Sequence, residues 1–117
     1  MKQGEIWEMY FDPIKGSEPA YRTGRQAGRR PALIISGNML NENLNIVIVC
    51  PLTTNIKGFK GNVVLNPTKE NGLNTSSEIL TFHVRSVSKE RLKKKLGVVS
   101  KGTIETIKKT LNDLLRY

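Results

Sequence analysis

The sequence predicts a mainly β fold with some α: a small, strongly bent antiparallel sheet or barrel that carries a C-terminal helix. Two observations predict it. Short runs of β-branched, aromatic and apolar residues alternate with turn residues as far as Val87, which is typical of small bent sheets. The last segment instead repeats apolar residues every three or four positions, which is the period of an amphipathic helix. A chain of 117 residues is long enough for one domain, residues 1–117, with a single modest core.

Turn residues separate the expected strands. Asp12-Pro13 ends the first strand, Gly37-Asn38 ends the second, and Asn66-Pro67 ends the fourth. A polar loop covers residues 15–30, and a loop of that length in a compact domain is often functional. The strands are expected at Glu5–Phe11, Ala32–Ile35, Ile46–Val49, Val63–Leu65 and Glu78–Val87.

Helices are expected after the strands. Ser88 can cap a short helix that runs through Lys95, with Leu92 as its apolar contact. Ser100 or Thr103 opens the last helix. Its apolar face consists of Ile104, Ile107, Leu111 and Leu114.

The charge balance favours a polyanionic partner. The chain has 19 Lys and Arg against 10 Asp and Glu, a net charge of +9. Nucleic acid is the first candidate and an acidic protein the second. A basic C-terminal third can also serve solubility alone.

The composition argues against several classes of protein. One His and one Cys, with no cluster of Asp or Glu, predict no metal site and no cofactor. Cys50 lies inside an apolar run and is expected to be a small buried hydrophobe. No stretch has the length of a membrane span and the N-terminus lacks the apolar core of a signal peptide, so we expect a soluble cytoplasmic protein.

An arginine that enters one strand and a hydroxyl that leaves the next can form a phosphate-handling site. Arg30 precedes the second expected strand, and Thr53 follows the third. RNA carries its own nucleophile, the 2′-hydroxyl, so a metal-free enzyme need only align it, move protons and stabilise the phosphorane charge. Arginine supplies planar donors for phosphate oxygens, and threonine adds one hydrogen bond.

Several spaced motifs occur in a recognisable order. They are Gly4–Trp7, Phe11–Pro13, Gly16–Glu18, Gln26–Ile35, Cys50–Thr54, Ser77–Leu80, Val84–Val87 and Lys89–Leu92. Together they resemble the MazF/PemK (Kid) family of toxin endoribonucleases, over nearly the whole chain.

The resemblance implies a Src-homology-3-like barrel of the CcdB/MazF/PemK type that forms a homodimer. It implies metal-independent, sequence-specific cleavage of single-stranded RNA to a 2′,3′-cyclic phosphate, restrained by a cognate acidic antitoxin of the MazE/PemI kind. By position, Arg30 and Thr53 are the implied catalytic residues. The residues expected to bind RNA or flank the site are Glu18, Gln26, Gly28, Arg29, Thr54, His83 and Arg85.

The sequence departs from the family pattern in two places. The segment Pro19–Arg25 is inserted after Glu18, which leaves the geometry of Glu18 open. Residues 80–82 lack the acid and base of the Kid-type toxins, and His83 stands where many members have glutamine. A lone histidine is more often structural than catalytic.

Simpler interpretations and other functions stay open at this point. Arg30 can pair with Glu18 or Glu78 at the surface, and Thr53 can be an ordinary strand residue. A CcdB-like barrel that poisons DNA gyrase ends in Trp-Gly-Ile, which differs from the end of this chain, Leu114–Tyr117. A non-catalytic nucleic-acid-binding barrel would explain the charge alone.

Overall fold

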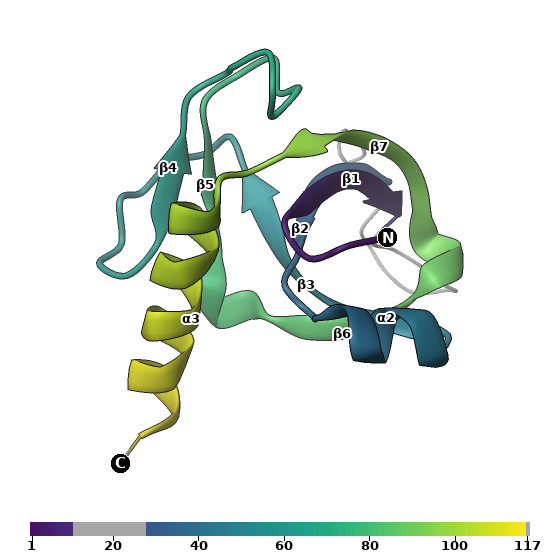
Figure 1. The fold of residues 1–117 in the computed structure, drawn as a ribbon. Coiled ribbons are helices and arrows are strands. Elements are labelled where there is room, and N and C mark those ends of the chain that lie inside the picture. The colour runs from purple at the N-terminus through teal and green to yellow at the C-terminus, as the bar shows by residue number, and fades with distance from the viewer. Residues whose placement is uncertain (11–27, 117) are drawn as a thin grey trace.

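The computed structural model describes residues 1–10 and 28–116. Its strands form one curled antiparallel sheet with the order β4-β5-β3-β2-β1-β7, and β6 also pairs with β3 (Figure 1). The helix α3 follows the last strand. The expectation of a mainly β, barrel-like fold with a C-terminal helix is therefore confirmed.

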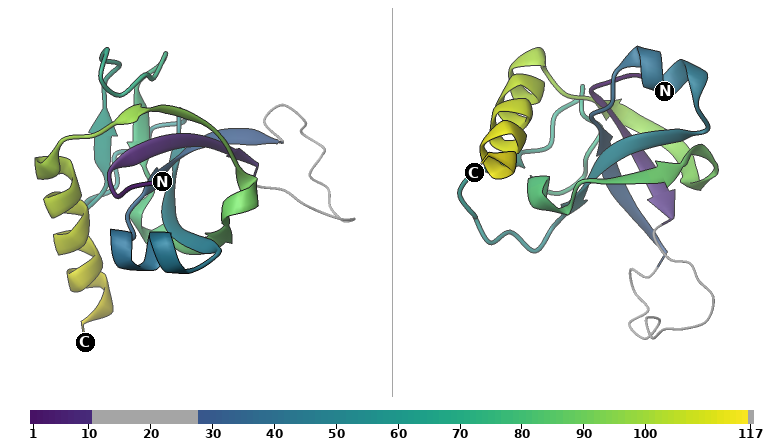
Figure 2. Two further views of the ribbon diagram at one scale, coloured as in Figure 1. Left: turned by 45° about the vertical axis from the view of Figure 1, so that its right-hand side comes forward. Right: turned by 90° about the horizontal axis from the view of Figure 1, so that it is seen from below.

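The elements are β1 (Glu5–Tyr10), β2 (Arg29–Ile34), α2 (Asn38–Asn43), β3 (Ile46–Thr53), β4 (Val63–Leu65), β5 (Ser77–Ile79), the 3₁₀ turn η1 (Thr81–His83), β6 (Arg85–Ser88), the 3₁₀ turn η2 (Lys89–Arg91), β7 (Leu92–Val98) and α3 (Lys101–Leu115). Figure 2 shows α3 beside the β4–β5 hairpin and α2 at another side of the curled strands. Among the described residues, no helix is long and apolar enough to cross a membrane.

The central strand β3 divides the sheet into two parts. One edge of β3 pairs with β2, while its other edge pairs first with β6 and then with β5. Leu52 is opposite Ile79, and Val49 is opposite Arg85. Val49 and Leu52 are three positions apart on β3, whereas their partners Ile79 and Arg85 are six positions apart. The three extra residues are taken up by η1. The expected continuous strand Glu78–Val87 is for this reason two strands with a turn between them.

Two cores lie on opposite faces of the sheet because alternate residues of a strand point in opposite directions. One core packs under α3, and the other fills the inside of the curl. The first contains Ile6, Leu33, Cys50, Leu52, Leu73, Ile79, Ile104 and Ile107. The second contains Met9, Ala32, Ile34, Val47, Val49, Val87 and Leu92.

Cys50 is a buried apolar residue, as its sequence context predicts. The side chain is fully enclosed, and burial raises the pKa of its thiol to about 12. The thiol is therefore protonated at neutral pH and contributes to the core as a hydrophobe.

The helix expected from Ser88 to Lys95 is wrong. Ser88 does cap a turn, since its Oγ accepts a hydrogen bond from Glu90 N at 3.2 Å. That turn is only η2, after which the chain pairs with β1 as β7, with Leu92 opposite Met9 and Lys95 opposite Trp7. Backbone pairing with β1 and burial of Leu92 outweigh the local helical preference of the lysines.

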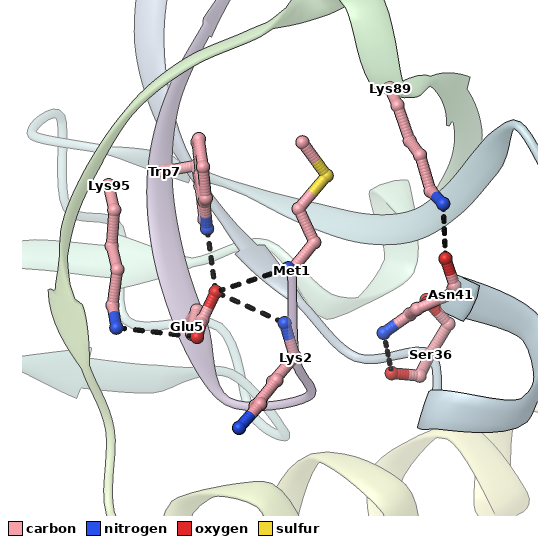
Figure 3. A network of polar contacts seen from close by, with 8 residues as sticks. All are labelled: Met1, Lys2, Glu5, Trp7, Ser36, Asn41, Lys89 and Lys95. Atoms are coloured by element: carbon pink, nitrogen blue, oxygen red, sulfur yellow. Dashed lines mark hydrogen bonds and ion pairs between the residues drawn. The ribbon is translucent and has the colours of Figure 1, made fainter.

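A buried carboxylate ties the start of β1 to β7 (Figure 3). Glu5 Oε1 accepts hydrogen bonds from Trp7 Nε1 at 2.9 Å and Lys2 N at 3.1 Å, and Lys95 Nζ lies 3.3 Å from Oε2. Burial alone would raise the pKa of Glu5, but these partners together lower it. The same figure shows the Ser36–Asn41–Lys89 contacts that hold α2, a short helix that the sequence pattern did not predict.

The last helix agrees with its prediction except at its end. Ser100 is the cap, and its Oγ accepts from Thr103 N at 3.1 Å. Ile104 and Ile107 are buried and Leu111 packs on the first core. Leu114 was expected on this apolar face, but it is 51% exposed because the helix extends beyond the sheet that covers its earlier turns.

Candidate active site

Arg30 and Thr53, far apart in the sequence, line the same pocket of about 260 Å³. The lining residues are Arg29, Arg30, Pro31, Leu52, Thr53, Thr54 and Ser77. The pocket lies where β2 begins and where β3 ends, because the two strands are antiparallel. The pattern predicted from the sequence, an arginine entering one strand and a hydroxyl leaving the next, is thus brought together by the sheet.

The register explains why these two side chains meet. Ala32 pairs with Pro51, and continuing that antiparallel register puts Arg30 opposite Thr53. Ala32 and Val49 belong to the core inside the curl. By strand alternation Arg30 and Thr53 project from that same face, at the end of the inner core.

Arg30 is half-buried, and this burial lowers the pKa of its guanidinium. An arginine nevertheless stays protonated in proteins at neutral pH. Removal of water strengthens its attraction for an anion. The site therefore presents a fixed cation on a strand, with planar donors suited to a phosphate.

Thr53 is half-buried and contributes an oriented hydroxyl. Its Oγ1 accepts a hydrogen bond from Asn55 N at 3.1 Å. A hydroxyl that accepts from a backbone N–H keeps its own O–H as a donor. This donor can be directed at a phosphate oxygen in the pocket.

Arg29 is more exposed than Arg30 and is positioned by contacts with β1. It forms an ion pair with Glu8 at 3.7 Å, and its Cζ lies 5.4 Å from the centroid of the Tyr10 ring. Gly28 packs against the same ring: a Cβ there would lie 3.2 Å from Cε1 of Tyr10. Lys93 Nζ is 5.3 Å from the ring centroid, so positive charge gathers beside the pocket.

The other expected site residues lie elsewhere. Glu18 and Gln26, with the insertion Pro19–Arg25, are outside the described residues. His83 belongs to η1 and Arg85 to β6, and neither lines the pocket. His83 is exposed, and its ring centroid is 5.1 Å from that of Phe82.

Sequence reasoning missed the structural role of Glu78, which pairs with Thr53 across β5 and β3 and is fully buried. Its carboxylate accepts four hydrogen bonds from one loop. Oε1 accepts from Lys57 N at 2.7 Å and Gly58 N at 3.1 Å. Oε2 accepts from Phe59 N at 3.0 Å and Asn62 Nδ2 at 2.9 Å.

These partners lower the pKa of Glu78, with the bond from Asn62 contributing most and that from Lys57 next. Asn62 Oδ1 also accepts from Thr81 N at 3.1 Å, so the loop is tied to both β5 and η1. The available signal was an acid inside a β-rich run and a loop with two glycines. Gly58 and Gly61 both adopt positive φ, at 71° and 95°.

The described residues contain no group of three or more His, Cys, Asp or Glu that could hold a metal ion. The polar residues that line the pocket are two arginines, two threonines and a serine. Such groups bind and polarise a phosphate through hydrogen bonds and charge.

Known proteins share this fold and much of this sequence. The chain is 31% identical over 114 residues to "Endoribonuclease toxin MazF" of Escherichia coli strain K12, covering 96% of this chain and 91% of that protein. It is 30% identical over 117 residues to "Endoribonuclease MazF9" of Mycobacterium tuberculosis, covering 95% and 92%. A solved MazE–MazF structure from Deinococcus radiodurans superposes with a TM-score of 0.75 at 25% identity, covering 98% and 95%.

The sequence pattern of a family described as "PemK-like, MazF-like toxin of type II toxin-antitoxin system" matches residues 2–115. This match spans almost the whole chain, including both strands that form the pocket. The chain therefore belongs to the PemK-like, MazF-like family of toxins of type II toxin–antitoxin systems.

Proposed function

We propose that this protein is a sequence-specific, metal-independent endoribonuclease, with Arg30 and Thr53 as its catalytic residues and the whole chain as one toxin domain. The observation that carries the proposal is that Arg30 and Thr53 line one pocket from two adjacent strands. Relatives that match nearly the full chain are named endoribonucleases, which supports the same activity here.

In the proposed reaction the 2′-oxygen of one nucleotide attacks the adjacent phosphorus while the bond to the 5′-oxygen breaks. The 2′-hydroxyl proton leaves to a base, and the departing 5′-oxygen takes up a proton. The products are a 2′,3′-cyclic phosphate and a 5′-hydroxyl. Arg30 stabilises the charge on the non-bridging oxygens and Thr53 donates one further hydrogen bond, so both act most strongly in the transition state.

The remaining predicted residues have supporting roles in this proposal. Arg29 and Thr54 line the pocket and contact the RNA backbone there, and Gly28 allows close packing beside Tyr10. Glu18 and Gln26 flank the RNA from the segment before β2. His83 and Arg85 contact RNA farther along the strand.

Purified protein incubated with a long single-stranded RNA in excess EDTA tests the proposal. We expect discrete cuts at one short motif, with cyclic phosphate at the new 3′ ends. Arg30→Ala should abolish the cuts, whereas Arg116→Ala, which removes an exposed arginine at the end of α3, should leave them unchanged. Binding without cleavage, with or without added magnesium, would favour a non-catalytic or gyrase-directed barrel instead.

We further propose that the toxin forms a homodimer and binds an acidic antitoxin in the bacterial cytoplasm. The exposed Leu114 and Leu115 at the end of α3, 51% and 83% accessible, support an apolar contact between copies. The net charge of +9 supports an acidic partner, and a related toxin has been solved together with MazE. Co-expression with a cognate acidic antitoxin should give a complex that protects RNA. An antitoxin that neither co-purifies nor protects would contradict this part.

A further inference from the structure

Three rings outside the catalytic pocket form a row on the surface, which we call the aromatic row: Phe59, Phe82 and His83. The centroids of Phe59 and Phe82 are 5.7 Å apart, and those of Phe82 and His83 are 5.1 Å apart, both pairs edge-on at 63°. Phe59 is 52% exposed and Phe82 is 45% exposed. Large apolar rings that are half-accessible and lie together indicate a binding surface more than an incomplete core.

The aromatic row is connected to the catalytic pocket through Glu78. Glu78 is the partner of Thr53 across the sheet, whereas its neighbour Ile79 points into the core under α3. By alternation Glu78 projects from the same face as Thr53. Its carboxylate accepts a hydrogen bond from Phe59 N at 3.0 Å. The loop that carries Phe59 therefore lies beside the Thr53 end of the pocket.

The loop is held in a defined conformation. Besides the four hydrogen bonds to Glu78, Gly61 O accepts from Thr110 Oγ1 of α3 at 3.0 Å. A Cβ at Gly61 would lie 3.0 Å from Thr110 Cγ2, and Gly61 has positive φ, so no other residue fits there without strain. The ring of Phe59 is thus presented from a pre-organised backbone, which reduces the entropy lost on binding.

Exposed cations lie close in sequence to the aromatic row. Lys57 and Lys60 are exposed on the same loop, and Arg85 is exposed two residues after His83. Accessible aromatic faces among positive charges are the arrangement that binds single-stranded nucleic acid, with bases on the rings and phosphates on the cations. An obligate protein interface would instead be depleted of lysine.

We propose that the aromatic row is a stacking subsite for a nucleobase that flanks the cleaved phosphate of single-stranded RNA, with Glu78 as the residue that positions it. This inference rests on the proposed endoribonuclease function. Phe59 and Phe82 supply the stacking surface, and His83 extends it. The catalytic pocket holds the phosphate, while the aromatic row selects and orients a neighbouring nucleotide.

The test uses RNA oligonucleotides that span the mapped cut and carry 2′-deoxyribose at the cleaved position, which removes the nucleophile. The fluorescent base 2-aminopurine, which is quenched by stacking, is placed at each flanking position in turn. The full-length protein should quench one of these positions. The double variant Phe59→Ala, Phe82→Ala should restore the fluorescence and raise Kd about 10-fold, since one base–aromatic stack is worth about that factor.

Two controls make the result specific. The double variant Phe59→Tyr, Phe82→Tyr keeps both rings and should retain the quenching and the affinity. Met39→Ala removes an exposed apolar side chain from α2, where it is 81% accessible, and should change neither. Cleavage of unmodified RNA by the double alanine variant should show a raised KM and a nearly unchanged kcat, because the pocket residues remain.

Other results would overturn the inference. Unquenched 2-aminopurine at every position, or equal Kd for the parent and the double alanine variant, excludes the stacking subsite. A double alanine variant that becomes monomeric while the parent is dimeric assigns the aromatic row to contact between copies. Loss of antitoxin binding with unchanged RNA binding assigns it to that protein.

The two proposals can fail separately. If no RNA is cut, the endoribonuclease proposal fails, and oligouridylate with a central 2-aminopurine then replaces the mapped oligonucleotide. Quenching of that probe, lost in the double alanine variant, would retain the stacking surface without the cleavage. An absence of quenching there as well would remove both proposals.

Discussion

The proposed catalytic pocket and the loop over residues 57–62 lie side by side but are held by different means. The pocket residues Arg30 and Thr53 stand on paired strands, and the register of β2 and β3 alone brings them together. The loop has no strand pairing in its middle. It is held by four hydrogen bonds to one buried carboxylate, Glu78, and by one further hydrogen bond from Thr110 of α3. The proposed chemistry is therefore built on paired strands, while the adjoining surface is positioned by side-chain contacts, most of them to Glu78.

The largest effect on rate is expected from Arg30, and it should be much larger than the effect of the adjacent pocket residue Arg29. Arg30→Ala should lower kcat by about 100- to 1,000-fold, the range for removing one donor to a transition-state anion. Arg29→Ala should mainly raise KM, and only modestly, because Arg29 is exposed and already paired with Glu8. Single-turnover cleavage of one RNA by both variants measures this difference, and equal losses in kcat would contradict the assignment of Arg30.

Thr53→Val should cause the second largest fall in kcat. The change keeps the β-branched shape on β3 and removes the hydroxyl, a hydrogen bond to a charged group worth about 10- to 100-fold in kcat. Asn55 N loses its acceptor but is exposed, so water can replace it. Thr53→Ser should recover most of the rate in the same assay. A Thr53→Val enzyme with the parental kcat would make Thr53 only a strand residue.

Glu78→Gln should disturb the loop and leave the chemistry of the pocket in place. The amide nitrogen of glutamine cannot accept, so one pair of loop N–H groups loses its partner. We expect KM to rise several-fold while kcat changes little. Glu42→Gln, an exposed glutamate of α2, is the matched control. A proportionate fall of kcat in Glu78→Gln, with KM constant, would show that Glu78 serves the pocket and not the loop.

The weakest effect that we expect is the dependence of stability on pH. The pKa of Glu78 is lowered in the folded state, so its contribution to the free energy of unfolding is present above the ordinary glutamate pKa and is lost as pH falls through the folded value. The pKa of Glu5 is also lowered in the folded state, so its contribution to stability is likewise lost as pH falls. Denaturant unfolding between about pH 5 and pH 3 should therefore lose less stability in Glu78→Gln than in the parent. If the free energy of unfolding fell equally with pH in the two proteins, the lowered pKa of Glu78 would be contradicted.

Much of the site was predictable because its signals are local. Arg30 stands beside Pro31 at the start of an apolar run, and Thr53 follows the strongest β pattern, so each could be placed at the end of a strand. The cap of the last helix was narrowed to Ser100 or Thr103 for the same reason, since a cap depends on the next three residues, and the structure has Ser100 there. The resemblance to the toxin family also rested on motifs that can be read in order along the chain.

The aromatic row and the loop that carries Phe59 were not predictable in this way. Glu78 reaches a loop that lies 16 to 21 residues earlier, and an acid in a β-rich run looks like a surface residue until the loop folds over it. Phe59 and Phe82 belong to separate irregular segments, whose meeting depends on the three-residue register change at η1. His83 and Arg85 follow the same register change and lie on η1 and β6, away from the pocket lining.

Neighbouring residues encode the alternation of strands and turns, the amphipathic last helix and the positions of Arg30 and Thr53 at strand ends. The reason is that periodicity, caps and strand ends are local properties of the chain. The tertiary arrangement decided three other features. Leu92–Val98 became a strand, Leu114 was left exposed, and the carboxylate of Glu78 was surrounded by the N–H groups of a distant loop. Each of these depends on which surface a segment meets. A lysine-rich segment becomes a strand when an open sheet edge pairs with it, and a carboxylate becomes an anchor when backbone N–H groups surround it.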